Sequence, residues 1–360
     1  MAVPLFDPQS VLRPLRGEIM AAIEGVVDGG QFVLGPQVEA FESDFAAFLG
    51  ARRVAGVAGV ANGTEAITIA LRALGVGPGD EVVVPSFTFY ASAEAIPPTG
   101  ATPVFCDIDL DTLCVTPETV KAALTPRTKA VVVVHLFGNV APVADIEALG
   151  VPVVEDAAQA AGARSPLGHR VGSLGTMATF SFYPSKNLGA FGDGGAVVSR
   201  DAELDDRVRT LRFHGSRDKV TYEQVGYNSR LDEVQAAILR VLLPHLDGWS
   251  DHRRQVSIWY GEEGLGGPVV ASGADPAWHL HVIRDGRGDA VAEALADKGV
   301  QARAYYRTPV HRQRAMAPWA PAHDLPATDE AARTHLALPM SASLTREQVS
   351  EVAAAYPRAA

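Results

Sequence analysis

The chain has 360 residues, 47% of them hydrophobic and 20% charged, so it can bury a sizeable core in one large and one smaller domain. Its formal net charge of −11 and the absence of a basic run argue against nucleic acid or an anionic membrane as a partner. Two cysteines cannot form a disulfide framework, and their spacing suggests no zinc site. With no apolar run near the ~20 residues of a membrane helix and no signal-peptide pattern at the start, we expect a cytoplasmic protein.

Helical and strand-like segments alternate through the first two-thirds of the chain. Residues 36–50 and 64–75 carry apolar side chains at helical spacing, and each segment ends in glycine. Shorter helices are predicted at 91–96, 116–124 and 142–149. Apolar runs typical of strands occupy 53–61, 81–85, 102–107, 129–136, 151–156, 177–183 and 194–199. These strands are continuously apolar, which predicts an α/β fold whose mostly parallel central sheet has helices on both faces.

The last third of the chain differs in pattern. A long amphipathic helix is predicted over 232–246, and the stretch 264–276, rich in Gly and Pro, follows it as a soft boundary. The remainder is typical of a smaller α+β domain. We therefore divide the chain into a large domain with an N-terminal arm, residues 1–245, and a small C-terminal domain, residues 246–360.

One candidate anion site lies in VANGTEAITIAL, residues 60–71, where a strand turns directly into a helix. Free backbone N–H groups and the helix dipole attract anions at such a terminus, and Gly63 lets a phosphate approach the backbone. Thr64 adds a hydroxyl donor. Asn and Thr are also good helix caps, so this stretch taken alone is better explained as an ordinary N-cap.

A candidate buried acid, Asp156, ends the apolar run VPVVED. A carboxylate at the C-terminal end of a central parallel strand points into the crevice where α/β proteins bind ligands. Its burial is costly unless it meets a cation, and a protonated pyridine nitrogen is such a partner. Gln159 could donate a hydrogen bond to an oxygen on the same ring. The alternative, in which Asp156 caps a helix that begins at residue 157, has nearly equal weight.

A candidate nucleophile, Lys186, lies in TMATFSFYPSKNLGAFGDGGAVVS, residues 176–199, in a glycine-rich loop between two predicted strands. A lysine desolvated in a pocket loses its proton more readily and can then form a Schiff base with an aldehyde. Ser181 on the incoming strand offers a hydroxyl to an anion. Taken alone, Lys186 is better explained as a surface residue. Together, the anion site, the acid and the lysine match the phosphate, pyridine nitrogen and aldehyde of pyridoxal 5'-phosphate (PLP).

Four segments give the sequence a specific resemblance: VANGTEAITIALRALGVGPGDEVVVPSFTF, VVEDAAQAAGA, FSFYPSKNLGAFGDGGAVVS and GYNSRLDEVQAAIL. In this order they resemble the DegT/DnrJ/EryC1/StrS family of sugar aminotransferases, which are PLP-dependent enzymes of fold type I in the aspartate aminotransferase superfamily. The weaker likeness extends over nearly the whole chain. The resemblance implies a PLP-binding large domain and a smaller C-terminal α+β domain.

The resemblance also implies a role for each matching residue. Lys186 corresponds to the lysine that forms the aldimine with PLP, and Asp156 to the acid that pairs with the pyridine nitrogen. The other implied cofactor contacts are Gly63, Thr64 and Ser181 at the phosphate, Phe89 stacked on the ring, Gln159 near the ring hydroxyl, and Asn228 at the phosphate of the neighbouring subunit. Asn228 therefore implies a homodimer with shared active sites. Without the family, Phe89 would be taken as a core aromatic and Asn228 as a turn residue.

The implied activity is transfer of an amino group from glutamate to a nucleotide-linked keto-sugar, with pyridoxamine 5'-phosphate as the intermediate cofactor form of a ping-pong mechanism. We favour a dTDP-3-keto-6-deoxyhexose as the sugar. The alternatives are an enzyme of the same fold that acts on a keto-cyclitol or as a sugar dehydratase, and a non-catalytic sensor. Lysine at position 186 argues against the dehydratase, because some dehydratase relatives carry histidine there.

Candidate substrate contacts lie in YYRTPVHRQ, residues 305–313, where Tyr306, His311 and Arg312 could meet a nucleotide diphosphate. Ordinary loop roles explain them equally well. His279 and His281 share one face of a predicted strand, but no carboxylate cluster accompanies them. We therefore expect structural or substrate-contact roles for these histidines, and no metal.

Overall fold

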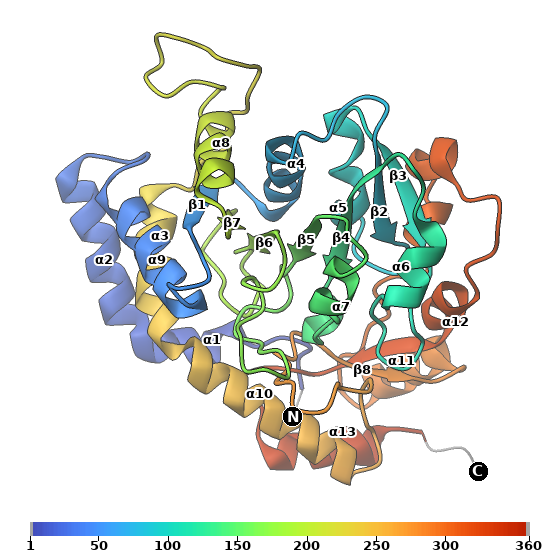
Figure 1. The fold of residues 1–360 in the computed structure, drawn as a ribbon. Coiled ribbons are helices and arrows are strands. Elements are labelled where there is room, and N and C mark those ends of the chain that lie inside the picture. Colours follow the sequence, from blue (N-terminus) through green and yellow to red (C-terminus); the bar gives the residue numbers. More distant parts are fainter. Residues whose placement is uncertain (1–2, 358–360) are drawn as a thin grey trace.

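The computed structural model describes residues 3–357 and is built around a seven-stranded sheet with the order β1-β7-β6-β5-β4-β2-β3 (Figure 1). The strands of this sheet are β1 (Gly56–Val60), β2 (Glu81–Pro85), β3 (Thr102–Cys106), β4 (Thr128–Val134), β5 (Val153–Asp156), β6 (Met177–Ser181) and β7 (Gly195–Ser199). Neighbours from β3 to β6 pair in parallel, whereas β7 is antiparallel to both β6 and β1.

Helices precede, connect and follow these strands. They are α1 (Pro8–Leu12), α2 (Arg16–Gly29), α3 (Pro36–Leu49), α4 (Gly63–Ala73), α5 (Ala91–Glu94), α6 (Pro117–Ala123), α7 (Val143–Glu147), α8 (Ala202–Arg212), α9 (Glu233–Leu242), α10 (Leu246–Glu262), α11 (Gly288–Asp297), α12 (Pro326–Thr334) and α13 (Arg346–Ala355). Short 3₁₀ turns occupy Arg13–Leu15, Pro97–Thr99, Leu136–Gly138, Leu243–His245, Val310–Arg312 and Arg314–Trp319. In Figure 1 the blue α2 and the yellow α9, far apart in sequence, lie side by side.

Helices cover both faces of the sheet, as the alternation of side chains along β7 shows. Val197 packs in one core with Ile67 of α4. Its neighbours Ala196 and Val198 pack in a second core with Phe41 of α3. Because successive side chains of a strand point to opposite faces, α4 and α3 lie on opposite sides of the sheet. The predicted α/β class, with a mostly parallel sheet between helices, is confirmed.

Strand β7 brings two distant segments together at one edge of the sheet. Its first residue, Gly195, lies opposite Val60 of β1 and Ser181 of β6. Because β7 is antiparallel to both neighbours, β1 and β6 run in the same direction and end on either side of Gly195. The start of α4, which follows β1, therefore lies beside Ser181.

The predicted helix over 232–246 is interrupted in the structure. Helix α9 ends at Leu242, a 3₁₀ turn spans Leu243–His245, and α10 begins at Leu246. Pro244 explains the break, because proline has no N–H to donate and its ring crowds the preceding turn. The sequence pattern correctly predicted an amphipathic helix here, but it did not predict the break between α9 and α10.

Strands β8 (His281–Arg284) and β9 (His335–Leu338) form a separate two-stranded antiparallel sheet. Val256 of α10 and Val349 of α13 belong to a core of their own with this sheet. Val310 and Leu325, however, pack into the core of the seven-stranded sheet, so packing crosses the predicted boundary. The division at residue 245 stays a prediction, and the outer ends of both predicted domains, residues 1–2 and 358–360, lie outside the described residues.

Within residues 3–357, no helix combines the length and the apolar character that a membrane crossing requires.

Candidate active site

Asp156 lies at the C-terminal edge of the sheet, as the last residue of β5, and is 5% exposed. Ser92 donates a hydrogen bond from Oγ to Asp156 Oδ2 at 2.7 Å, and the Ala158 amide donates to Oδ1 at 3.2 Å. The residues that follow form turns rather than a helix, so Asp156 does not act as a helix cap. Its carboxylate is held at the edge where the ends of the parallel strands meet.

Ser92 is a contact that sequence reasoning missed. It lies in α5, one helical turn after Thr88, and their hydroxyl oxygens are 3.0 Å apart. Both residues are buried, which makes a hydroxyl chain from Thr88 through Ser92 to the Asp156 carboxylate. Two hydroxyls four residues apart in an apolar segment were the available sequence signal. They fix the orientation of the acid.

Lys186 lies in the loop that follows β6, and its amide donates to the Tyr183 carbonyl at 2.8 Å. A Cβ atom at Gly189 would lie 2.7 Å from the Pro184 carbonyl oxygen, so glycine is needed where the loop folds back. Burial lowers the pKa of the Lys186 amine, and the negative charge of Asp156 opposes that shift only in part. The loop thus holds a desolvated amine near the buried acid.

The start of α4 supplies unpaired backbone donors. The Asn62 side chain accepts a hydrogen bond from the Glu65 amide at 2.9 Å, which confirms its role as the helix cap. The Gly63 and Thr64 amides have no partner among residues 3–357. A Cβ atom at Gly63 would lie 2.7 Å from Cβ of Ser181, so only glycine fits this approach. The cap satisfies the Glu65 amide and leaves these two amides unpaired, so it is compatible with the predicted anion site.

Gln159 has a defined orientation. Its Oε1 accepts a hydrogen bond from the Phe137 amide at 2.6 Å, and its Nε2 donates to the Tyr306 hydroxyl at 3.1 Å. An amide N–H can meet only an acceptor, so the Phe137 contact identifies Oε1 and leaves a second N–H on Nε2. Tyr306 also stacks on Phe137, with ring centroids 5.7 Å apart. The structure therefore places Tyr306 beside a predicted cofactor contact.

Phe89 is 55% exposed, and its ring centroid lies 6.5 Å from that of Tyr306. An aromatic ring with this exposure is not a core residue, which removes the alternative left open by the sequence. Its face is accessible next to the Gln159–Tyr306 pair.

His279, which the sequence left as a structural or substrate-contact residue, lies near Lys186. The Asn187 side chain donates to the Ala277 carbonyl at 2.7 Å, so its Oδ1 is the acceptor for His279 Nδ1–H at 3.0 Å. Burial lowers the pKa of His279 well below its ordinary value, and the positive charges of Lys186 and Arg253 lower it further. The imidazole is therefore neutral, with its proton on Nδ1.

His311 and Arg312 are not brought together with Lys186. The His311 ring is hydrogen-bonded to the Ser86 hydroxyl, and Arg312 forms an ion pair with Asp329. Both line a separate cavity of about 440 Å³. Their predicted contact with substrate stays a prediction. His281, the neighbour of His279 on the predicted strand, donates a hydrogen bond from Nε2 to the Leu265 carbonyl at 2.7 Å. No group of three His, Cys, Asp or Glu side chains that could hold a metal ion gathers among residues 3–357.

Asn228 is exposed and follows a loop that projects from the end of α8 (Figure 1). Its backbone pairs with Phe213, which anchors the returning strand of this loop. Asn228 is thus held at the surface, as the predicted contact with a neighbouring subunit requires.

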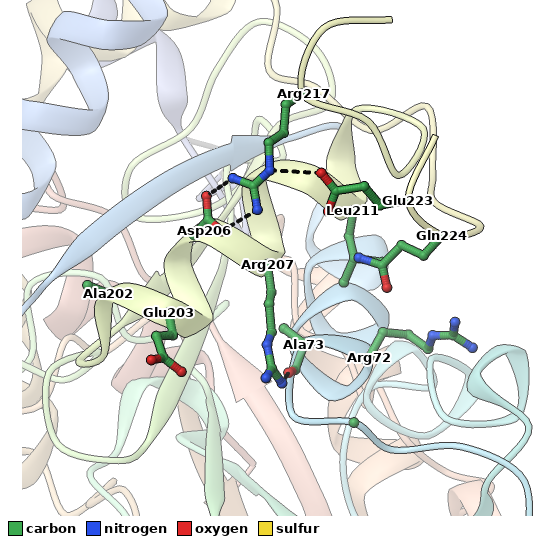
Figure 2. Close-up of a pocket in the computed structure, with 11 residues that line it drawn as sticks. Arg72, Ala73, Ala202, Glu203, Asp206, Arg207, Leu211, Arg217, Glu223 and Gln224 are labelled. Carbon is green, nitrogen blue, oxygen red and sulfur yellow. Dashed lines mark hydrogen bonds and ion pairs between the residues drawn. The ribbon is translucent and has the colours of Figure 1, made fainter. Parts of the chain in front are cut away.

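A second, open pocket of about 710 Å³ lies between α4, α8 and the projecting loop, and Figure 2 shows its lining residues. Arg217 there pairs with Asp206 and Glu223, and Arg207 donates to the Ala73 carbonyl. None of the predicted site residues lines this pocket. We therefore assign this pocket no catalytic role.

Comparison with known proteins identifies the chain's relatives. The chain is 45% identical to dTDP-3-amino-3,4,6-trideoxy-alpha-D-glucose transaminase of Streptomyces venezuelae, over 97% of this chain and 94% of that protein. It is 44% identical to UDP-N-acetyl-3-dehydro-alpha-D-glucosamine 3-aminotransferase of Acidithiobacillus ferrooxidans, over 99% and 98%. The crystal structure of DesV from S. venezuelae, in complex with a ketimine intermediate, superposes with a TM-score of 0.94 at 45% identity, over 98% and 97% of the two chains.

These likenesses identify the fold as that of PLP-dependent aminotransferases of fold type I. The family model for DegT/DnrJ/EryC1/StrS aminotransferases matches residues 14–356. The predicted resemblance is confirmed, and the chain belongs to the DegT/DnrJ/EryC1/StrS aminotransferase family.

Proposed function

We propose that this protein is a PLP-dependent aminotransferase that moves an amino group from glutamate to a nucleotide-linked keto-sugar. The strongest support is the arrangement of Lys186, whose pKa burial lowers, near the buried carboxylate of Asp156. The names of two relatives over nearly the whole chain, one acting on a dTDP-sugar and one on a UDP-sugar, point to the same class of substrate.

The residues present fit PLP on three counts. Lys186 offers a desolvated amine for the aldehyde, and Asp156 offers a carboxylate for the pyridine nitrogen. At the start of α4, two amides without protein partners and a position where a Cβ would clash leave a cradle for a phosphate. When bound, PLP supplies an aldehyde that condenses with amines and a ring that accepts electrons from the substrate carbon.

The chain's own residues would then divide the work. The lowered pKa of Lys186 leaves more neutral amine near neutral pH than an exposed lysine has, and that amine can carry a proton to and from the substrate carbon. General acid–base transfer of this kind is worth ~10²–10⁴-fold in rate. Asp156 would keep a proton at the pyridine nitrogen, and Ser92 holds the Asp156 carboxylate in place by donating a hydrogen bond to it. The free N–H of Gln159 is available to an oxygen on the ring.

We also infer a homodimer in which Asn228 of one subunit reaches the cofactor phosphate of the other. The loop before Asn228 exposes Val220, Tyr222 and Val225 by 81%, 61% and 84%. Apolar side chains gathered on a projecting loop are typical of a segment that another molecule covers. Mixing inactive Lys186→Ala and Asn228→Ala subunits should regenerate activity through hybrid dimers, and no recovery from a demonstrated exchange of subunits would contradict shared sites.

The substrate we favour is a dTDP-3-keto-6-deoxyhexose. Purified protein reconstituted with PLP should transfer the amino group of glutamate to a member of a panel of dTDP-, UDP- and GDP-keto-sugars, detected as amino-sugar product by mass spectrometry. Lys186→Ala should abolish multiple turnover, whereas the exposed Lys129, changed to Ala, serves as the matched control. Full turnover by Lys186→Ala, or no turnover of the whole panel, would refute the proposal.

A further inference from the structure

A cavity of about 500 Å³ adjoins Lys186. It is lined by the start of the chain around α1, the loop that carries Lys186, helix α10 and the segment 340–342. The lining is largely apolar, with Phe6, Leu12 and Trp249 among its walls. Such a space, in which polar and charged groups stand among apolar walls, is typical of a small-molecule site whose polar residues fix the orientation of the ligand.

Arg253 of α10 carries the second positive charge that lines this cavity, beside Lys186. Its Nη1 donates to the Trp278 carbonyl at 3.1 Å and to the His279 carbonyl at 3.4 Å. Within residues 3–357 no carboxylate pairs with its guanidinium, and both of its hydrogen bonds are made by Nη1. Burial lowers the pKa of Arg253 to about 10, and no nearby carboxylate opposes that shift.

The acid that shares the cavity does not supply that counter-ion. Asp7 accepts hydrogen bonds from the amide and the hydroxyl of Ser10, and so caps α1. The two cations, by contrast, act on the same group, because the charges of Lys186 and Arg253 both lower the pKa of His279. Arg253 is therefore near the amine yet free of a protein anion.

We propose that Arg253 binds a carboxylate of the amino donor and so aligns the donor with Lys186. This inference rests on the proposed function, in which an amino acid delivers its nitrogen at the position of the Lys186 amine. A guanidinium offers a planar fork of donors that matches a carboxylate, and the pair is stronger in an apolar site than in water. One unpaired guanidinium in an apolar cavity suits a single carboxylate better than a diphosphate, which carries more charge.

The test measures binding of glutarate, a dicarboxylate without an amine, to the PLP-loaded protein by isothermal titration calorimetry. A hydrogen bond to a charged group is worth about 1.5–3 kcal/mol, so Arg253→Met should raise the Kd of glutarate about 10- to 100-fold. Arg253→Lys, which keeps the charge without the fork, should have an intermediate Kd. Arg254→Met is the matched control, because Arg254 is the next residue of α10 and pairs with Asp251.

A titration with dTDP and with UDP distinguishes a diphosphate from a carboxylate at the same site. Unchanged nucleotide affinity in Arg253→Met, with weakened glutarate, supports the proposal. A glutarate Kd that stays within twofold of wild type, or a loss confined to the nucleotides, overturns it. If neither Arg253 variant folds, glutarate soaked into wild-type crystals decides: a carboxylate on the guanidinium supports the proposal, and a carboxylate elsewhere overturns it.

The two proposals fail separately. If wild type transfers no amino group from glutamate while glutarate binding still depends on Arg253, the proposed function fails and the carboxylate site stands. If glutamate is a donor but Arg253→Met and wild type bind glutarate alike, only the role of Arg253 is refuted.

Discussion

Replacing Gly63 by alanine should disturb the protein at the point where α4 begins against β6. The added Cβ would lie 2.7 Å from Cβ and 3.2 Å from Cα of Ser181. Carbon atoms in contact prefer separations of about 3.5–4.0 Å, so the overlap is roughly 1 Å. Ser181 ends a strand that pairs on both sides, with β5 and β7, and therefore cannot withdraw easily.

Two quantities should change in Gly63→Ala. Overpacking of this kind typically costs about 1–3 kcal/mol, which should appear as a lower free energy of unfolding in urea. The methyl group would also intrude on the unpaired amides at the start of α4, so the Kd for PLP, followed by absorbance titration of the apoprotein, should rise at least ~10-fold, the equivalent of about 1.4 kcal/mol. The unfolding experiment probes the packing, and the titration probes the phosphate cradle.

Two further variants make the result decisive. Gly25 lies inside α2 with no atom within 4 Å of an added Cβ, so Gly25→Ala should instead stabilise the protein by about 0.5–1 kcal/mol. Adding Ser181→Gly to Gly63→Ala removes the Cβ overlap and should recover part of the stability. It should not restore PLP affinity, because a hydroxyl is lost. Wild-type stability together with wild-type PLP affinity in Gly63→Ala would refute the reasoning.

Three other variants test the buried polar groups. Burial lowers the pKa of Lys186 from its ordinary 10.5, so below pH 10.5 the unfolded chain binds a proton more readily than the native apoprotein does. The apoprotein of Lys186→Met should therefore have a higher free energy of unfolding in urea at pH 7 than the wild-type apoprotein. This difference should disappear above pH 10.5. Glu155→Gln should lower the free energy of unfolding by about 3–5 kcal/mol. The fully buried Glu155 carboxylate accepts hydrogen bonds from three backbone amides and from the His135 ring, and the NH₂ group of glutamine cannot accept them. An unchanged urea midpoint would contradict this prediction. Tyr306→Phe removes the hydroxyl that accepts from Gln159 and should lower the free energy of unfolding by about 1 kcal/mol. In steady-state kinetics it should change the KM of the sugar nucleotide more than the KM of glutamate, and equal changes would contradict the predicted contact of Tyr306 with the nucleotide.

Much of the site could be read from the sequence, because its motifs are local. The strand that ends at Asp156, the glycine loop around Lys186 and the strand-to-helix turn at Gly63 each carry their own composition signal. What local patterns could not reveal is which distant groups support them. Ser92 lies 64 residues from the acid that it orients, and the neutral state of His279 depends on contacts that only folding creates.

The sequence by itself determined the α/β class and the family, and it predicted the lysine, the acid and the anion site, because strand burial, helix caps and glycine turns depend on neighbouring residues. Only the tertiary structure decided which chemical groups share one space. The antiparallel insertion of β7 brings Gly63 to Ser181, and the packing of α10 beside the Lys186 loop leaves Arg253 in the cavity of Lys186 without a counter-ion. His311 and Arg312, adjacent in sequence to the Tyr306 loop, lie in a different cavity, because burial and pairing are properties of the folded chain rather than of sequence distance.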